Sequence, residues 1–349
     1  ISAVLILYPV MTNPIEWMVL RVAIGFSFSG VYITAERWLN HAATTETRGK
    51  ALSLYLIVQM TGIIAAQGLV VLADPGGFVL FILPSVLVSL AFAPILLSIS
   101  PTPAFATTRR MSLGELYRIS PLGVVGILAM GAVFSAQFGM AAVFGTNAGL
   151  SVGELSLFIS LMYAGGLVMQ FPIGWISDRV ERRQLILAVA GLGAAGALVP
   201  VLWPGSYTAL LGAAFLLGGT ANPLYALIIA YTNDFLEPDD MPAASAGLMF
   251  VNGVGAVAGP LATGWAMAKV GPQGFWLYLA AVLAVLVLYG LWRSTQRPGV
   301  PTEDTQSYAA VLASASAVAV DMAQEIYAEA VEEAAEEGSD DITRPSAAQ

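Results

Sequence analysis

The sequence contains no cysteine, one histidine and few charged residues. Of its 349 residues, 11% are charged and 57% are hydrophobic, whereas an ordinary soluble domain has about 25% charged residues. The absence of cysteine excludes disulfides and thiolate chemistry. The histidine, His41, is expected in a loop and has no neighbour at metal-ligand spacing. The composition therefore predicts an integral membrane protein without a metal site.

Two kinds of chemical motif are also missing. No stretch matches the phosphate-binding pattern GxxxxGK[ST], which argues against ATP-driven transport. Within the apolar segments, histidines and carboxylates do not cluster at catalytic spacing. We therefore expect no enzyme, no cofactor and no nucleic-acid partner.

The net charge of −9 comes from the C-terminal tail. Residues 299–349 contain eleven acidic residues and one arginine, so the rest of the chain has a net charge of +1. The acidity therefore says nothing about a substrate. The Ala- and Glu-rich stretch 305–337 favours helix and is either a frayed solvated tail or a partner-binding helix.

Ten apolar segments are long enough, or nearly so, to cross a bilayer, which takes roughly 20 helical residues. We place them at about 1–11, 17–38, 51–73, 77–98, 121–145, 154–174, 184–203, 207–232, 243–268 and 274–292. Ser151 and Glu154 are spaced as a capping box before one of them. Between the fourth and fifth segments, a polar linker contains the pattern of a short surface helix near 113–119.

Positive charge is concentrated in alternate loops. One set of loops contains eleven Lys or Arg residues, whereas the opposite set contains only Lys269. Because cytoplasmic loops are enriched in Lys and Arg, both ends of the chain are expected in the cytoplasm.

Ten residues near the middle form a charged hairpin between two of these segments. They read Gly174-Trp-Ile-Ser-Asp178-Arg179-Val-Glu-Arg182-Arg183. The pattern G-x-x-x-D-R-x-x-R-R resembles the loop signature of the major facilitator superfamily. The resemblance implies that Gly174, Asp178, Arg179, Arg182 and Arg183 form a gating motif.

Other stretches are similar to the YcaD-like subgroup of that family. They are Arg21-x-x-x-Gly25-x-x-x-x-Gly30, residues 36–40, 120–126 and 230–234, and Gly253-x-Gly255-x-x-x-Gly259-Pro260. The resemblance implies an all-α membrane protein with the major facilitator two-bundle fold. Its ten transmembrane helices would be equivalent to helices 3–12 of twelve, of which helices 4, 7 and 10 line the central cavity.

An internal repeat is visible at an offset of 193 residues. It matches Tyr32 with Tyr225, Gln59 with Asn252 and Gly62 with Gly255, and related halves are common in transporters. By this repeat the first half lacks two helices, so the chain is expected to be N-terminally truncated. We expect a four-helix remnant (1–98), a cytoplasmic linker (99–120), a six-helix bundle (121–296) and an acidic cytoplasmic tail (297–349).

Two charged residues of the second segment are candidates for function. Arg21 lies inside the span, where a charge needs a partner or water. It either contacts an anionic substrate group or reaches to the outer interface. Glu36 is a candidate for proton coupling, or it pairs with Arg37, Arg48 or Arg109 at the interface.

Polar and aromatic residues on the helices implied to line the cavity are the other pathway candidates. They are Tyr32, Phe134, Gln137, Phe138, Asn222 and Tyr225. Aromatic rings with a few amides suit a neutral or amphipathic solute. Helix–helix hydrogen bonding is the alternative role for the amides.

Asp178 is expected to act across the boundary between the two halves. It would cap backbone N–H groups at the start of a facing helix of the first half, at Arg48-Gly49-Lys50-Ala51, and meet Arg48. Arg182 and Arg183 would orient the loop or contact lipid phosphates.

The sequence thus predicts a monomeric secondary transporter of the bacterial inner membrane. It would move a small solute by alternating access, with protons as the candidate coupling ion and membrane lipids as its surroundings. The alternative is a non-transporting receptor or assembly factor on the same fold.

Overall fold

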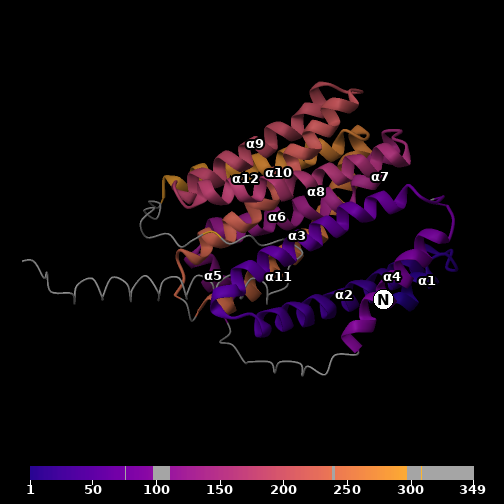
Figure 1. Ribbon diagram of the computed structural model, residues 1–349. Coiled ribbons are helices and arrows are strands. Elements are labelled where there is room, and N and C mark those ends of the chain that lie inside the picture. The colour runs from indigo at the N-terminus through magenta and orange to yellow at the C-terminus, as the bar shows by residue number, and fades with distance from the viewer. Residues whose placement is uncertain (75, 97–110, 238–239, 297–307, 309–349) are drawn as a thin grey trace, which may run out of the picture.

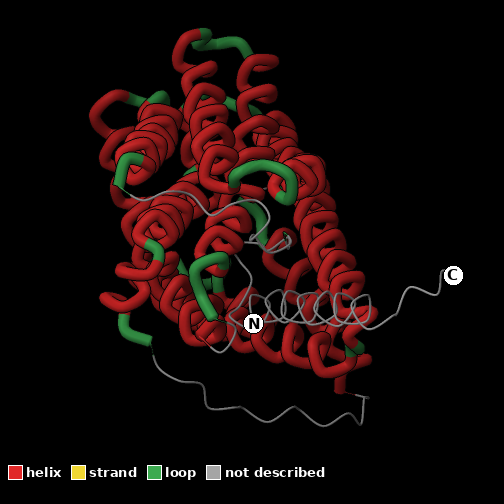
Figure 2. Tube along the Cα trace, turned by 90° about the vertical axis from the view of Figure 1, so that its left-hand side faces the viewer, coloured by secondary structure: helices red, strands yellow, loops and turns green. Residues whose placement is uncertain are grey.

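The computed structural model describes the chain except for residues 75, 97–110, 238–239, 297–307 and 309–349. The described part is helical and contains no strand (Figures 1 and 2). The side chains of Asn40, His41, Thr45, Glu46, Arg48 and residues 94–96 also lie outside the described residues. His41 itself belongs to the last turn of a helix rather than to a loop.

Four helices precede the linker. They are α1 (Ser2–Leu7), α2 (Pro14–Ala42), α3 (Thr45–Val70) and α4 (Val79–Leu96). Helix α2 begins with a capping box in which the Asn13 side chain accepts from Ile15 N–H and Glu16 accepts from Asn13 N–H. Helix α3 begins at Thr45, six residues before the expected start, because Thr44 and Thr47 form a capping box there.

Eight helices follow the linker. They are α5 (Leu113–Ile119), α6 (Pro121–Gly139), α7 (Ala141–Asn147), α8 (Val152–Ser177), α9 (Arg182–Leu202), α10 (Tyr207–Asn233), α11 (Met241–Val270) and α12 (Gly274–Ser294). The predicted short helix near 113–119 and the Ser151–Glu154 capping box are both confirmed. The segment expected at 121–145 is divided into α6 and α7 at Met140, which the sequence did not indicate.

The count of ten spanning helices is not confirmed. Among the described residues, eight helices are long and apolar enough to cross a membrane: α2, α3, α6 and α8–α12. The first expected segment is helical only over the six residues of α1, about 9 Å at 1.5 Å per residue, too short for a bilayer. Helix α4 is apolar but shorter than the eight.

The helices after the linker pack around α10. Of the apolar part of α10, 89% is buried, compared with 6% for α2 and 11% for α3. Helix α10 contacts α6, α8 and α9, and α6 packs along α11. At Gly218 a Cβ would come within 1.8 Å of the Met162 carbonyl oxygen, so α8 and α10 can approach this closely only because the residue is glycine.

Helix α3 joins the first group of helices to the second. It packs along α8, while α1 and α4 contact each other beside the start of α2 (Figure 1). The starts of α2 and α10, at residues 14 and 207, differ by 193, the offset of the sequence repeat. The α3–α8 contact brings residues of the two groups together at one cavity.

Candidate functional site

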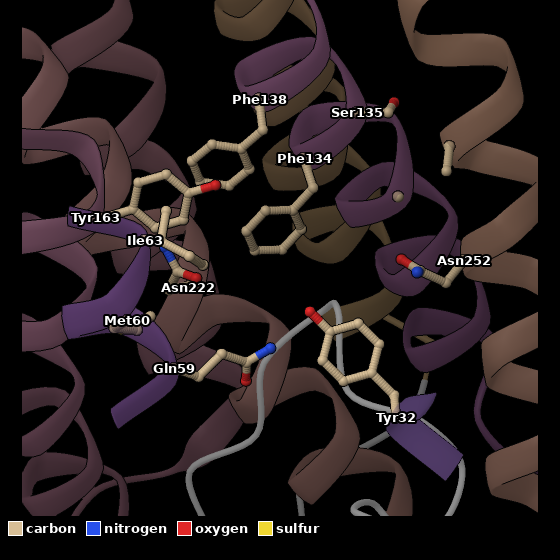
Figure 3. A pocket seen from close by; sticks show the side chains of 12 residues that line it. Tyr32, Gln59, Met60, Ile63, Phe134, Ser135, Phe138, Tyr163, Asn222 and Asn252 are labelled. Atoms are coloured by element: carbon tan, nitrogen blue, oxygen red, sulfur yellow. The ribbon is translucent and has the colours of Figure 1, made fainter. Parts of the chain in front are cut away.

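A cavity of about 370 Å³ lies between the two groups of helices. Helices α2 and α3 line it from one side, and α6, α8, α10 and α11 line it from the other (Figure 3). The residues that line it are Tyr32, Gln59, Met60, Ile63, Gly131, Phe134, Ser135, Phe138, Tyr163, Asn222, Asn252 and Ala256. None of these residues is charged, and most lie near the middle of their helices.

Aromatic rings form one wall of the cavity. The rings of Phe138 and Tyr163 are stacked with centroids 4.4 Å apart, and Phe134 stacks on Phe138 at 5.9 Å. Tyr225 lies behind them and meets Phe134 edge to face at 6.0 Å. Such pairs hold one another in fixed orientations, so the wall presents flat apolar faces to the cavity.

Polar groups reach the cavity from the other elements. The hydroxyl of Tyr32 and the amide of Gln59 point into the space opposite the aromatic wall (Figure 3). Asn222 donates to the Gly218 carbonyl at 3.1 Å, so its side-chain oxygen remains available as an acceptor. A largely apolar lining with a small number of polar groups is the usual composition of a small-molecule site.

The structure brings together only some of the pathway candidates. Tyr32, Phe134, Phe138 and Asn222 line this cavity. Tyr225 and Gln137 are buried inside the second group and are not part of its lining. Arg21 lies with Trp17 and Met18 at a separate, open surface depression on α2.

Glu36 lies one helical turn from the cavity residue Tyr32 on α2. Its side chain is only 1% exposed. The hydroxyl of Tyr55, on α3, donates to its Oε1 at 2.9 Å. A carboxylate shielded from water between two helices can respond to their relative movement.

The charged hairpin lies between α8 and α9, and its residues have different surroundings. Arg182 is 1% exposed and binds Asp234 at the end of α10, with Nη1 2.6 Å from Oδ1. Its Nε donates to the Ser177 hydroxyl at 3.2 Å. Arg182 therefore connects three helix ends, and burial removes it from lipid phosphates.

The other two arginines of the hairpin lie nearer the surface. Arg179 donates to the Trp175 carbonyl at 2.7 Å and covers the ring of Trp175. Arg183 forms an ion pair with Glu181 at 2.8 Å. Both contacts stay within the hairpin and its two flanking helices.

Eight of the twelve lining residues were not among the sequence-based site candidates, among them Gln59, Tyr163 and Asn252. Gln59 and Asn252 had a usable signal, because the 193-residue repeat matches these two amides with each other. Both line the cavity, one from each group of helices. Tyr163 lies on α8 without a repeat partner in the matched stretch, and nothing in its local sequence indicates its role.

The fold defines a membrane protein of helical-bundle type with a central cavity, the general form of a solute transporter. Residues 122–324 match the family model described as Major Facilitator Superfamily. The chain belongs to this superfamily.

Relatives with similar sequences have transporter names. The chain is 25% identical over 275 residues to "Uncharacterized MFS-type transporter YfkF" of Bacillus subtilis (strain 168), covering 77% of this chain and 70% of the relative. It is 24% identical over 290 residues to "Uncharacterized MFS-type transporter YcaD" of Escherichia fergusonii, covering 81% and 74%. The predicted similarity to the YcaD-like subgroup is thus confirmed, and these relationships indicate a transporter rather than an enzyme.

Proposed function

We propose that this protein moves a small neutral or amphipathic solute across the bacterial inner membrane by alternating access through the central cavity. The observation that supports this most directly is that the cavity is lined by both groups of helices. A change in the relative position of the two groups would therefore alter the access of a solute to the cavity. A non-transporting receptor or assembly factor has no need of such a space between the groups.

The lining indicates the class of solute. A charged solute would need opposite charge or many dipoles in a site shielded from water, and none of the lining residues that the structure describes is charged. The stacked rings of Phe138 and Tyr163 offer a face to a flat apolar group. The amides of Gln59, Asn222 and Asn252 would orient its polar atoms.

Proton coupling through Glu36 is part of the proposal. Glu36 lies one turn from Tyr32 and is bound by Tyr55 of α3. When the cavity is open, protonation of this carboxylate would change its hydrogen bond with Tyr55, and with it the contact between α2 and α3. The loop charges favour a cytoplasmic position for both ends of the chain, and with this orientation the α8–α9 hairpin and Glu36 would both lie toward the cytoplasm.

The halves, the gate and the surroundings complete the proposal. Residues 1–98 and 121–296 would be the moving groups. The hairpin from Gly174 to Arg183 would act as the gating motif on the cytoplasmic side between them. The linker residues 97–110 and the tail, except Tyr308, lie outside the described residues. The protein would act as a monomer among membrane lipids.

Uptake into proteoliposomes tests the proposal. A panel of neutral aromatic solutes is screened first, and the solute that is taken up is used with three variants. Phe138→Ala and Asn222→Ala should raise the half-saturating concentration by about tenfold, because each removes one contact to the solute. Phe250→Ala is the matched control, since Phe250 on α11 is 61% exposed and lies outside the cavity.

Equal half-saturating concentrations in the cavity variants and in the control would contradict the assignment of this cavity. Preference for charged over neutral solutes would contradict the solute class.

A further inference from the structure

Three residues at successive turns of α8 contact one residue of the C-terminal tail. Gln170, Gly174 and Asp178 are spaced by four and therefore share a face of the helix. Gln170 Nε2 donates to the Tyr308 hydroxyl at 2.9 Å. The backbone N–H of Tyr308 donates to Asp178 Oδ1 at 2.7 Å. We name Gln170, Gly174 and Asp178 the α8 stripe.

The ring of Tyr308 fits against Gly174. A Cβ at position 174 would lie 2.5 Å and 2.7 Å from two ring carbons of Tyr308, so any larger residue would push the ring away. The ring is partly buried and packs against the hydrophobic core. Gln170 is buried as well. The α8 stripe thus binds the hydroxyl, the ring and the backbone of the same tyrosine.

This contact occupies the carboxylate that was expected to cap α3. An N–H bound to a carboxylate is a charge-assisted hydrogen bond, stronger than a neutral one. The first turn of α3 has its own capping box at Thr44 and Thr47. In this structure Asp178 therefore has a bond to the tail, and the start of α3 is capped without it.

We propose that Tyr308 is an intramolecular ligand of the α8 stripe and that it competes with α3 for Asp178. Docking of Tyr308 stands on the contacts above. The competition rests on the proposed alternating-access function, since the bond to Tyr308 would keep Asp178 from closing the cytoplasmic side. Tyr308 would then regulate how often that side opens.

A disulfide tests the docking in the full chain, which has no cysteine of its own. The Cβ built at 174 lies 3.4 Å from Cγ of Tyr308, which brings the two Cβ atoms near disulfide range, about 3.5–4.5 Å. Gly174→Cys with Tyr308→Cys should crosslink under mild oxidation, because the cysteine at 308 keeps the backbone N–H bond to Asp178 and the disulfide traps the docked state. Cleavage at a protease site inserted in the Trp203–Gly205 loop, followed by non-reducing electrophoresis, shows the bond.

The matched control is Trp175→Cys with Tyr308→Cys. Trp175 lies at the same depth, one residue along α8, and is 61% exposed. Efficient crosslinking of the 174 pair and not of the 175 pair supports docking. Equal crosslinking of both pairs, or none in a protein that elutes as a single folded species, would overturn it.

A labelling experiment tests the competition. Tyr32→Cys in the cavity is labelled with a membrane-impermeant maleimide from the cytoplasmic side. Adding Tyr308→Ala removes the ring and the hydroxyl that hold this residue against the α8 stripe, so labelling should slow about tenfold. Tyr308→Phe keeps the ring and the backbone bond, so its effect should be much smaller.

The two parts fail in different ways. A 174–308 crosslink with unchanged labelling in Tyr308→Ala would overturn regulation and keep docking. A cavity cysteine that is never labelled, with or without Tyr308, would contradict the proposed function, while the crosslink would still support docking.

Discussion

Arg182 and Asp234 form a buried ion pair in which one guanidinium nitrogen reaches both carboxylate oxygens. Nη1 of Arg182 lies 2.6 Å from Oδ1 and 2.7 Å from Oδ2. Both side chains are 1% exposed. The pair connects the start of α9 to the end of α10, the most buried of the eight candidate spanning helices among the described residues. It therefore fixes the charged hairpin to the core of the second group.

Breaking this pair should destabilise the protein strongly. Asp234→Asn or Arg182→Gln leaves one buried charge without its partner, and such losses cost about 3–5 kcal/mol. The double variant Arg182→Met, Asp234→Leu removes both charges and should cost less than either single change. Thermal unfolding in detergent measures the three values.

Glu181→Gln is the control for this prediction. Glu181 pairs with Arg183 nearer the surface, with side chains 23% and 11% exposed. Since such pairs are worth about 0–1 kcal/mol, this variant should unfold near the wild-type temperature. An equal loss in Glu181→Gln and Asp234→Asn would show that the buried pair has no special role.

Gln137→Leu should raise the stability. Gln137 is fully buried on α6, and neither polar atom of its amide has a hydrogen-bond partner among the described residues. An unsatisfied buried polar group costs about 1–3 kcal/mol, which the leucine variant would recover in part.

Thr263→Val is the matched control for Gln137→Leu. Its buried hydroxyl donates to the Gly259 carbonyl at 2.8 Å, so removing it gives no gain. A lower unfolding temperature in Gln137→Leu would mean that the amide has a stabilising partner.

Glu36→Gln should abolish proton-driven uptake. Glutamine resembles a permanently protonated carboxyl group, so a pH gradient could no longer drive the cycle. Exchange of labelled for unlabelled solute at equal pH should persist, because it needs no net proton movement. Glu237→Gln, at an exposed position after α10, is the control. Gradient-driven uptake that survives in Glu36→Gln would show that the coupling group lies elsewhere.

Helix positions could be predicted because a bilayer demands long apolar runs. Their ends could not, since polar first turns extend beyond the apolar run. Helix α3 begins at Thr45 through a capping box of two threonines, although its apolar run starts later. The break at Met140 between α6 and α7 interrupts an apolar run, so hydropathy did not indicate it.

The cavity could be predicted in part. Knowing which helices line the cavity was enough to identify Tyr32, Phe134, Phe138 and Asn222. The rotation of a helix about its axis was not known, and one residue corresponds to about 100° of rotation. Phe138 therefore lines the cavity while its neighbour Gln137 is buried away from it.

Solvent access to the cavity is the most direct test of the central claim. In the cysteine-free chain, Tyr32→Cys is compared with Phe26→Cys on the same helix, where Phe26 is 84% exposed on the outer surface of α2. Both are treated with a water-soluble maleimide in proteoliposomes, with and without the transported solute. The account predicts that Tyr32→Cys is labelled and that the solute protects it, whereas Phe26→Cys reacts slowly and is unaffected by the solute. Equal labelling of the two positions, with no protection by any solute taken up, would contradict it.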